Sequence, residues 1–152
     1  MKENTCFLFG HAIAQPELLP RLEKAVEKHY TQYNARCFIV GCRGCFDQYA
    51  TTVIKHLKEK YDDISLVMLL AYHPAERKVV LTKGFDGTFY PPLERVPRKY
   101  AIVKANQYMV TYADSIICYA KYPGNSRKML EFAKHKHTKK HIPITNVADE
   151  DI

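Results

Sequence analysis

The sequence predicts an α/β domain: a three-layer sandwich in which a mostly parallel, doubly wound sheet is flanked by helices. Short apolar segments alternate with longer amphipathic ones along the chain, as in folds where crossover helices join parallel strands. The length of 152 residues fits a single domain, residues 1–152. With 47% hydrophobic and 26% charged residues, the composition is that of an ordinary globular protein.

Two short apolar runs, each followed by a glycine, predict buried strands at residues 5–9 (TCFLF) and 37–40 (CFIV). Each run leads into a longer segment in which apolar residues recur three and four positions apart. This spacing predicts helices at residues 17–33 and 46–61. Because a helix separates each strand from the next, the strands are expected to lie parallel.

The second half of the chain continues the alternation with one interruption. Residues 65–71 (SLVMLLA) are the most apolar run, so we expect this strand at the centre of the sheet, buried on both faces. Residues 76–97 are irregular, because their prolines exclude a long helix. Further periodicities predict helices at residues 100–112 and 126–136 and strands at residues 115–119 and 142–147.

Charge and hydropathy exclude several protein classes. The 23 Lys and Arg against 16 Asp and Glu give a net charge of +7, which favours anionic partners. The longest apolar run, residues 66–71, is too short to span a membrane, and the N-terminus lacks the pattern of a secretory signal. We therefore expect a cytoplasmic protein without a membrane partner, whose five cysteines form no disulfide framework.

Three predicted strands end in loops that contain glycine. They read Gly10-His11, Gly41-Cys42-Arg43-Gly44 and Pro123-Gly124-Asn125-Ser126. All three would lie at the carboxyl edge of the sheet, where such folds bind ligands. The last two enter helices, whose free N–H groups suit a phosphate, although glycine also serves tight turns. The dinucleotide and P-loop fingerprints, GxGxxG and GxxxxGK[ST], are absent.

Three polar side chains near these loops have two interpretations each, and a fourth, Asp114, has one. Asp47 either complements the dipole of its helix or accepts a hydrogen bond from a ribose hydroxyl. Asn106, on the helix face that carries Met109, bonds either to the protein or to a ligand. Tyr72, just after its strand, either covers the sheet or stacks on a base. Asp114 precedes its strand, so we expect a structural role at the opposite edge.

Three segments occur in an order and at a spacing that match a known family: FLFGH (7–11), FIVGCRGCFDQYA (38–50) and ANQYMVTYADSIICYAKYPGNS (105–126). They resemble the SLOG-type proteins, small bacterial, Rossmann-like relatives of the LOG phosphoribohydrolases that were once misnamed lysine decarboxylases. The resemblance implies a doubly wound sheet that binds nucleotides or nucleotide derivatives. His11 matches a family position, whereas the arginine that often follows it is replaced by Ala12.

The catalytic positions of hydrolytic relatives are only partly kept. Those enzymes cleave an N-glycosidic bond with an Arg-Lys pair on a helix and a PGGxGTxxE loop. The pair is replaced here by Ala105 and Asn106, and the loop, PGNSRKMLE (123–131), keeps Glu131 but loses two glycines and the threonine. The resemblance therefore implies a protein that binds or senses a nucleotide-type ligand. The alternative is a nucleoside-monophosphate N-glycosidase that uses Glu131.

Two other patterns suggest different chemistry. Cys42 and Cys45 form a C-x-x-C motif at a helix N-terminus, where the dipole lowers a thiol pKa, so a thiol oxidoreductase is a further alternative. The basic run KHKHTKKH (134–141) could bind metal or nucleic acid, but cations also favour a helix C-terminus. We predict neither a metal site nor nucleic-acid binding, and no cofactor beyond a nucleotide-derived ligand. The sequence leaves open whether the protein forms a homo-oligomer.

Overall fold

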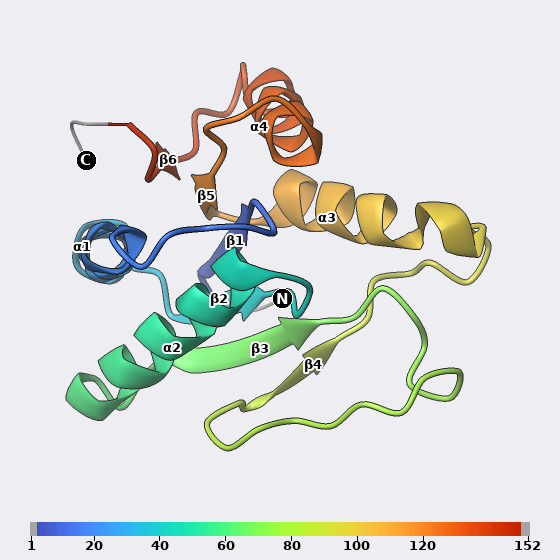
Figure 1. Cartoon of the computed structure of the whole chain (residues 1–152), viewed down its shortest axis with the longest axis horizontal. Coiled ribbons are helices and arrows are strands. Elements are labelled where there is room, and N and C mark those ends of the chain that lie inside the picture. Colours follow the sequence, from blue (N-terminus) through green and yellow to red (C-terminus); the bar gives the residue numbers. More distant parts are fainter. Residues whose placement is uncertain (1–2, 150–152) are drawn as a thin grey trace.

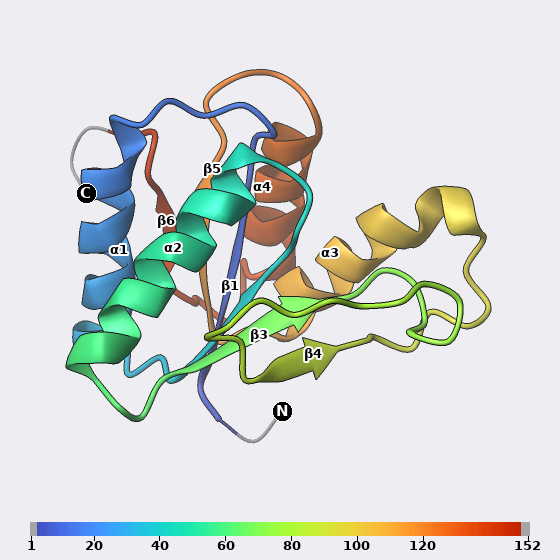
Figure 2. The same ribbon diagram turned by 60° about the horizontal axis from the view of Figure 1, so that its bottom comes forward.

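The computed structural model describes residues 3–149 and contains a six-stranded, all-parallel sheet with helices on both faces (Figures 1 and 2). The fold class is as predicted. The elements follow one another as β1 (Thr5–Gly10), α1 (Leu18–Gln32), β2 (Cys37–Val40), α2 (Cys45–Lys60), β3 (Ser65–Leu69), β4 (Gly87–Phe89), the 3₁₀ turn η1 (Arg98–Tyr100), α3 (Ala101–Tyr112), β5 (Ser115–Tyr119), α4 (Asn125–Lys136) and β6 (Ile144–Asn146). No helix in this part of the chain has the length and apolar character needed to cross a bilayer.

The order of strands in the sheet is β4-β3-β2-β1-β5-β6. The chain builds outward from β1 to β4 and then returns through α3 to pair β5 with the free side of β1. Helices α1 and α2 pack together on one face of the sheet, and α3 and α4 pack together on the other (Figure 1). The direction of strand order therefore reverses between β1 and β5.

The prediction that residues 65–71 form the central strand is wrong. β3 ends at Leu69 and lies second from the edge, next to β4, while β1 and β2 occupy the middle. Val67 and Met68 are accordingly only half-buried. The short strand β4 falls in the segment predicted to be irregular, and the last strand covers only Ile144–Asn146.

Alternation along the central strands divides the core into two parts. In β1, Leu8 faces α1 and α2, whereas Phe7 and Phe9 face α3 and α4. Successive side chains of a strand point to opposite faces, so a short run such as TCFLF is apolar throughout because both faces are covered. This explains why the predicted bounds of β1, β2 and β5 agree closely with the structure.

Two polar residues, Asp114 and His29, link elements at the amino edge of the sheet, where the strands begin. Asp114 Oδ2 accepts a hydrogen bond from the Thr5 N–H at 2.8 Å, the structural role expected for Asp114. His29 of α1 is fully buried, with Nδ1 3.1 Å from the Ser115 hydroxyl and Nε2 2.8 Å from the Thr145 hydroxyl. Burial and the charge of Lys28 lower the pKa of His29 to about 4. The imidazole is therefore a neutral link between α1, β5 and β6.

The depressed pKa of His29 predicts a loss of stability in mild acid. In the unfolded chain His29 takes up a proton near pH 6.5, whereas the buried ring stays neutral down to about pH 4. The contribution of His29 to the free energy of unfolding should therefore fall between about pH 6.5 and 4 by about 3 kcal/mol, and this contribution should change no further below that range. Urea unfolding across this range should show a shallower pH slope for His29→Gln, because glutamine does not titrate.

The matched control is His135→Gln, since His135 is exposed on α4. This variant should keep the wild-type slope. Equal slopes for the wild type and His29→Gln would contradict the assignment.

Candidate ligand-binding site

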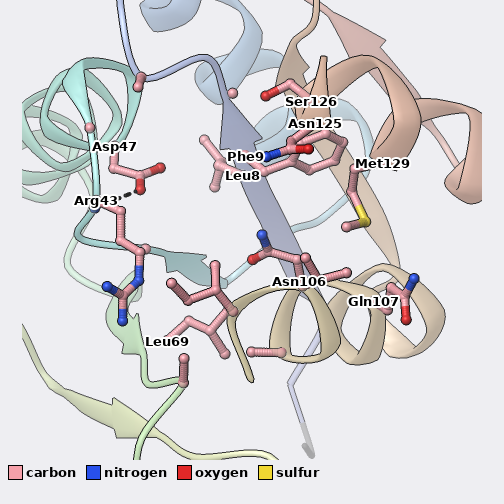
Figure 3. Close-up of a pocket in the computed structure, with 18 of the residues that line it drawn as sticks. Leu8, Phe9, Arg43, Asp47, Leu69, Asn106, Gln107, Asn125, Ser126 and Met129 are labelled. Carbon is pink, nitrogen blue, oxygen red and sulfur yellow. Dashed lines mark hydrogen bonds between the residues drawn. The ribbon is translucent and has the colours of Figure 1, made fainter. Parts of the chain in front are cut away.

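A cavity of about 460 Å³ opens at the carboxyl edge of the sheet, between the N-terminal ends of α2 and α4 and the first half of α3 (Figure 3). The ends of β1, β2 and β3 contribute Leu8–Gly10, Gly41 and Leu69 to its lining. The cavity therefore lies at the strand ends and beside the reversal in strand order, where doubly wound sheets bind ligands. Its volume is in the range of small-molecule sites, about 300–1,000 Å³.

The structure brings most of the predicted site residues together. On the side of β1 and α2 the lining includes Gly10, Gly41, Arg43, Gly44 and Asp47. Across the cavity it includes Asn106, Asn125 and Ser126. The remaining predicted residues are not among those that line it: His11, Cys42, Tyr72, Gly124 and Glu131.

Asp47 sits in the first turn of α2 with its carboxylate facing the cavity. Its Oδ2 accepts a hydrogen bond from the Arg43 N–H at 3.0 Å, and Oδ1 has no hydrogen-bond partner within residues 3–149. Burial raises the pKa of the Asp47 carboxyl above its usual value, and both the N–H and the charge of Arg43 oppose that rise. One carboxylate oxygen is thus fixed by the backbone and the other is available to a donor in the cavity.

Close packing accounts for three of the predicted loop glycines, Gly10, Gly41 and Gly44, where an added Cβ would lie within 3.0 Å of another atom. A Cβ at Gly10 would lie 2.5 Å from Cγ of the Phe46 ring, and one at Gly41 would lie 2.8 Å from Asp47 Oδ2. Glycine at these positions lets α2 approach the strand ends. The Cys45 N–H, at the start of α2, donates to the Ala12 carbonyl at 2.8 Å. Together with Asp47, this carbonyl supplies negative charge at the α2 N-terminus, which makes it a poor site for a phosphate.

The N-terminus of α4 has the opposite character. Gly124 before it has φ +141°, a Cβ there would meet nothing within 4 Å, and the first turn contains no acidic residue. The cavity is lined here by Asn125, Ser126 and Lys128. An open helix N-terminus beside a lysine favours an anion.

The third side of the cavity comes from α3. The Asn106 side chain projects into the space between Arg43 and Met129 (Figure 3), and no described residue hydrogen-bonds its amide. Ile102 and Val103, which line the cavity at the start of α3, are exposed to solvent. These two residues were not predicted as site residues. Hydropathy gave no signal for them, because apolar residues of an amphipathic helix are expected to face the core.

His11 contacts the protein instead of lining the cavity. Its Nε2 accepts hydrogen bonds from the N–H groups of Lys121 (2.8 Å) and Tyr122 (3.0 Å). Burial and the charge of Arg127 lower the pKa of His11, which favours the neutral ring that this acceptor role requires. His11 therefore joins the loop after β1 to the loop that leads into α4.

The other candidates lie around the site. Glu131 is exposed on α4, away from the cavity lining. Cys42 is exposed and lines a smaller neighbouring hollow, while the Cys45 thiol is half-buried and donates to the Ala14 carbonyl at 3.3 Å. Both thiols are free. This arrangement keeps the C-x-x-C motif at the helix start as predicted and brings neither thiol into the main cavity.

The basic run also has a structural contact. His137 Nε2 donates to the Val110 carbonyl at 2.7 Å, which ties the end of α4 to α3. No three His, Cys, Asp or Glu side chains within residues 3–149 are grouped as a metal site would require.

Comparison with known proteins adds no relative, since neither a protein-family model nor a curated protein matches the chain.

The backbone at Gly124 predicts a specific cost of substitution. A Cβ in this conformation strains the chain by about 1–3 kcal/mol, because the region is almost exclusive to glycine. Gly124→Ala should therefore lower the free energy of unfolding by that amount in urea titrations. Gly87→Ala is the matched control, since a Cβ at Gly87 also meets nothing within 4 Å and its φ is not positive. Equal stability of the two variants would show that the loop before α4 tolerates side chains.

Proposed function

We propose that this protein binds a nucleotide or a nucleotide-derived ligand in the cavity and acts as a binding or sensing protein without efficient catalysis. One observation carries the proposal. A carboxylate oxygen with no hydrogen-bond partner among residues 3–149, Asp47 Oδ1, and an open, acid-free helix N-terminus at Asn125 face one cavity from opposite sides (Figure 3). A ribose hydroxyl needs such an acceptor, and a phosphate needs such donors.

The rest of the lining supports the same ligand class. Leu69, Ala71 and the Ile102–Val103 pair give the apolar surface that a base requires. The Asn106 amide supplies both a donor and an acceptor for the polar edge of a base. A ligand with an anionic end, a diol and a flat apolar end would use all of these groups.

The same lining argues against efficient hydrolysis of an N-glycosidic bond. Cleavage requires charged groups placed against the developing charges of the transition state. Ala105, at the position where the resemblance to the LOG phosphoribohydrolases places an arginine, lines the cavity with a methyl group, and Glu131 is exposed outside it. The loss of one preorganised charge contact lowers such rates by about 100- to 1000-fold.

Ligand binding is tested by thermal shift and calorimetry with AMP, other nucleoside monophosphates, nucleosides and inorganic phosphate. Nucleoside monophosphates should raise the melting temperature more than nucleosides or phosphate alone. Asp47→Asn should weaken binding by about 10- to 100-fold, the range expected for a hydrogen bond to a charged group, because asparagine keeps the bond from Arg43 but loses the charge.

Asp62→Asn is the matched control for Asp47→Asn, since Asp62 is exposed beyond the end of α2. It should bind as the wild type does. The proposal fails if no nucleotide shifts the melting temperature, or if Asp47→Asn and Asp62→Asn bind equally.

Hydrolysis is tested by release of free base from AMP. Wild-type protein and Glu131→Gln should both stay near the buffer background, because Glu131 does not line the cavity. Turnover near the median enzyme rate of about 10 per second, abolished in Glu131→Gln, would instead establish the N-glycosidase alternative.

A further inference from the structure

Three arginines converge on one tyrosine beside the cavity. The guanidinium carbon of Arg77 lies 4.1 Å from the Tyr72 ring centroid, and those of Arg43 and Arg98 each lie 5.4 Å from it. The three come from separate segments: the loop after β2, the connection between β3 and β4, and η1. The guanidinium groups therefore surround the ring of Tyr72, which was predicted either to cover the sheet or to stack on a base.

The protein balances the charges of this arginine cluster only in part, since the Asp47 carboxylate interacts with the charge of Arg43. No Asp or Glu in the described part of the chain forms an ion pair with Arg43, Arg77 or Arg98. All three side chains are exposed, whereas the Tyr72 ring is half-buried. Like charges gathered around one ring repel one another, and their cation–π contacts add no negative charge. A bound anion would supply that charge.

The cluster is continuous with the cavity through Arg43. Arg43 lines the cavity, and its side chain runs from the loop before α2 toward the end of β3 (Figure 3). A ligand in the cavity therefore has a phosphate-binding end at α4 and a second cationic surface on the side of α2 and β3. Arginine suits this second surface, because its planar fork binds phosphate oxygens in pairs.

From this juxtaposition we infer that the arginine cluster around Tyr72 binds a second phosphate group, so that the ligand is a nucleotide with at least two phosphates. The inference rests on the proposed function, since it assumes a nucleotide in the adjacent cavity. Two kinds of ligand carry such a group: a nucleoside with a phosphate chain, and a nucleoside with phosphates at both ends of the ribose.

The test compares AMP, ADP, adenosine 3′,5′-bisphosphate and pyrophosphate by calorimetry. The wild type should bind one of the two-phosphate nucleotides at least 10-fold more tightly than AMP, and the better of the two identifies the arrangement of phosphates. The preference should shrink as salt is raised, because the cluster is exposed.

The variant for this test is Arg77→Gln/Arg98→Gln, which leaves Arg43 in the cavity lining intact. It should lose the preference and keep the affinity for AMP, while Arg77→Lys/Arg98→Lys should retain part of the preference through charge. Arg95→Gln is the matched control, since Arg95 is exposed on the same segment as Arg98 and makes no ring contact in the described structure. Circular dichroism confirms that each variant is folded.

The outcomes separate the two proposals. If AMP binds but the second phosphate adds no affinity, or if Arg77→Gln/Arg98→Gln keeps the preference, the cluster is not a phosphate site and the proposed function stands. If no nucleotide binds, the proposed function fails. Pyrophosphate binding then tests whether the arginine cluster is an anion site. Pyrophosphate binding that is lost in Arg77→Gln/Arg98→Gln supports an anion site there, and binding that is absent or unchanged overturns it.

Discussion

The reversal of strand order between β1 and β5 is the constraint on which the rest of this structure depends. The chain leaves β1 and β2 toward helices on one face of the sheet, and it leaves β5 toward α4 on the other face. Loops that follow neighbouring strands therefore separate at the carboxyl edge, and side chains do not fill the space between them. In a fold with every crossover on one face, the same loops would pack on one another. The cavity is thus a consequence of topology, and its chemistry is set by which side chains the separated loops carry.

Those loops differ in electrostatic character although both join a strand to a helix through glycine. At the N-terminus of α2, the Asp47 carboxylate of the first turn and the Ala12 carbonyl of the loop after β1 both accept N–H groups, so the positive end of that helix dipole is already paired. The α4 loop brings no acid to its helix and relies on the conformation of Gly124 to keep the backbone open. This asymmetry gives the cavity an acceptor side and a donor side, and it would orient a ligand that has a hydroxyl at one end and an anion at the other.

The sequence was sufficient for the local part of this architecture. Strands such as residues 37–40 and 115–119 were predicted with correct bounds, because burial on both faces leaves a continuous apolar run. Strand order is not a local property, so hydropathy gave β3 the wrong position. β4 has only three residues, too few for a hydropathy pattern. Asp86, which precedes it, bonds to the backbone of Leu66 through both its carboxylate and its N–H. This contact has no signature in the sequence. In the site, most of the residues predicted in the strand-end loops line the cavity, but most of the lining was not predicted. The contacts that hold His11 arise only when two distant loops meet.

The protonation state of Asp47 depends on the burial of its carboxylate, and under the proposed function it would also depend on ligand binding. Burial disfavours the charged form, and a single backbone N–H on Oδ2 compensates only in part, so the pKa stays raised. A hydroxyl donor from a bound ribose would add a hydrogen bond at Oδ1 and favour the charged form again. If a ribose binds as proposed, ionisation of Asp47 and binding would therefore favour each other. Under the proposed function, Asp47 Oδ1 is the acceptor that a ribose hydroxyl would use, because no other group in residues 3–149 hydrogen-bonds to it.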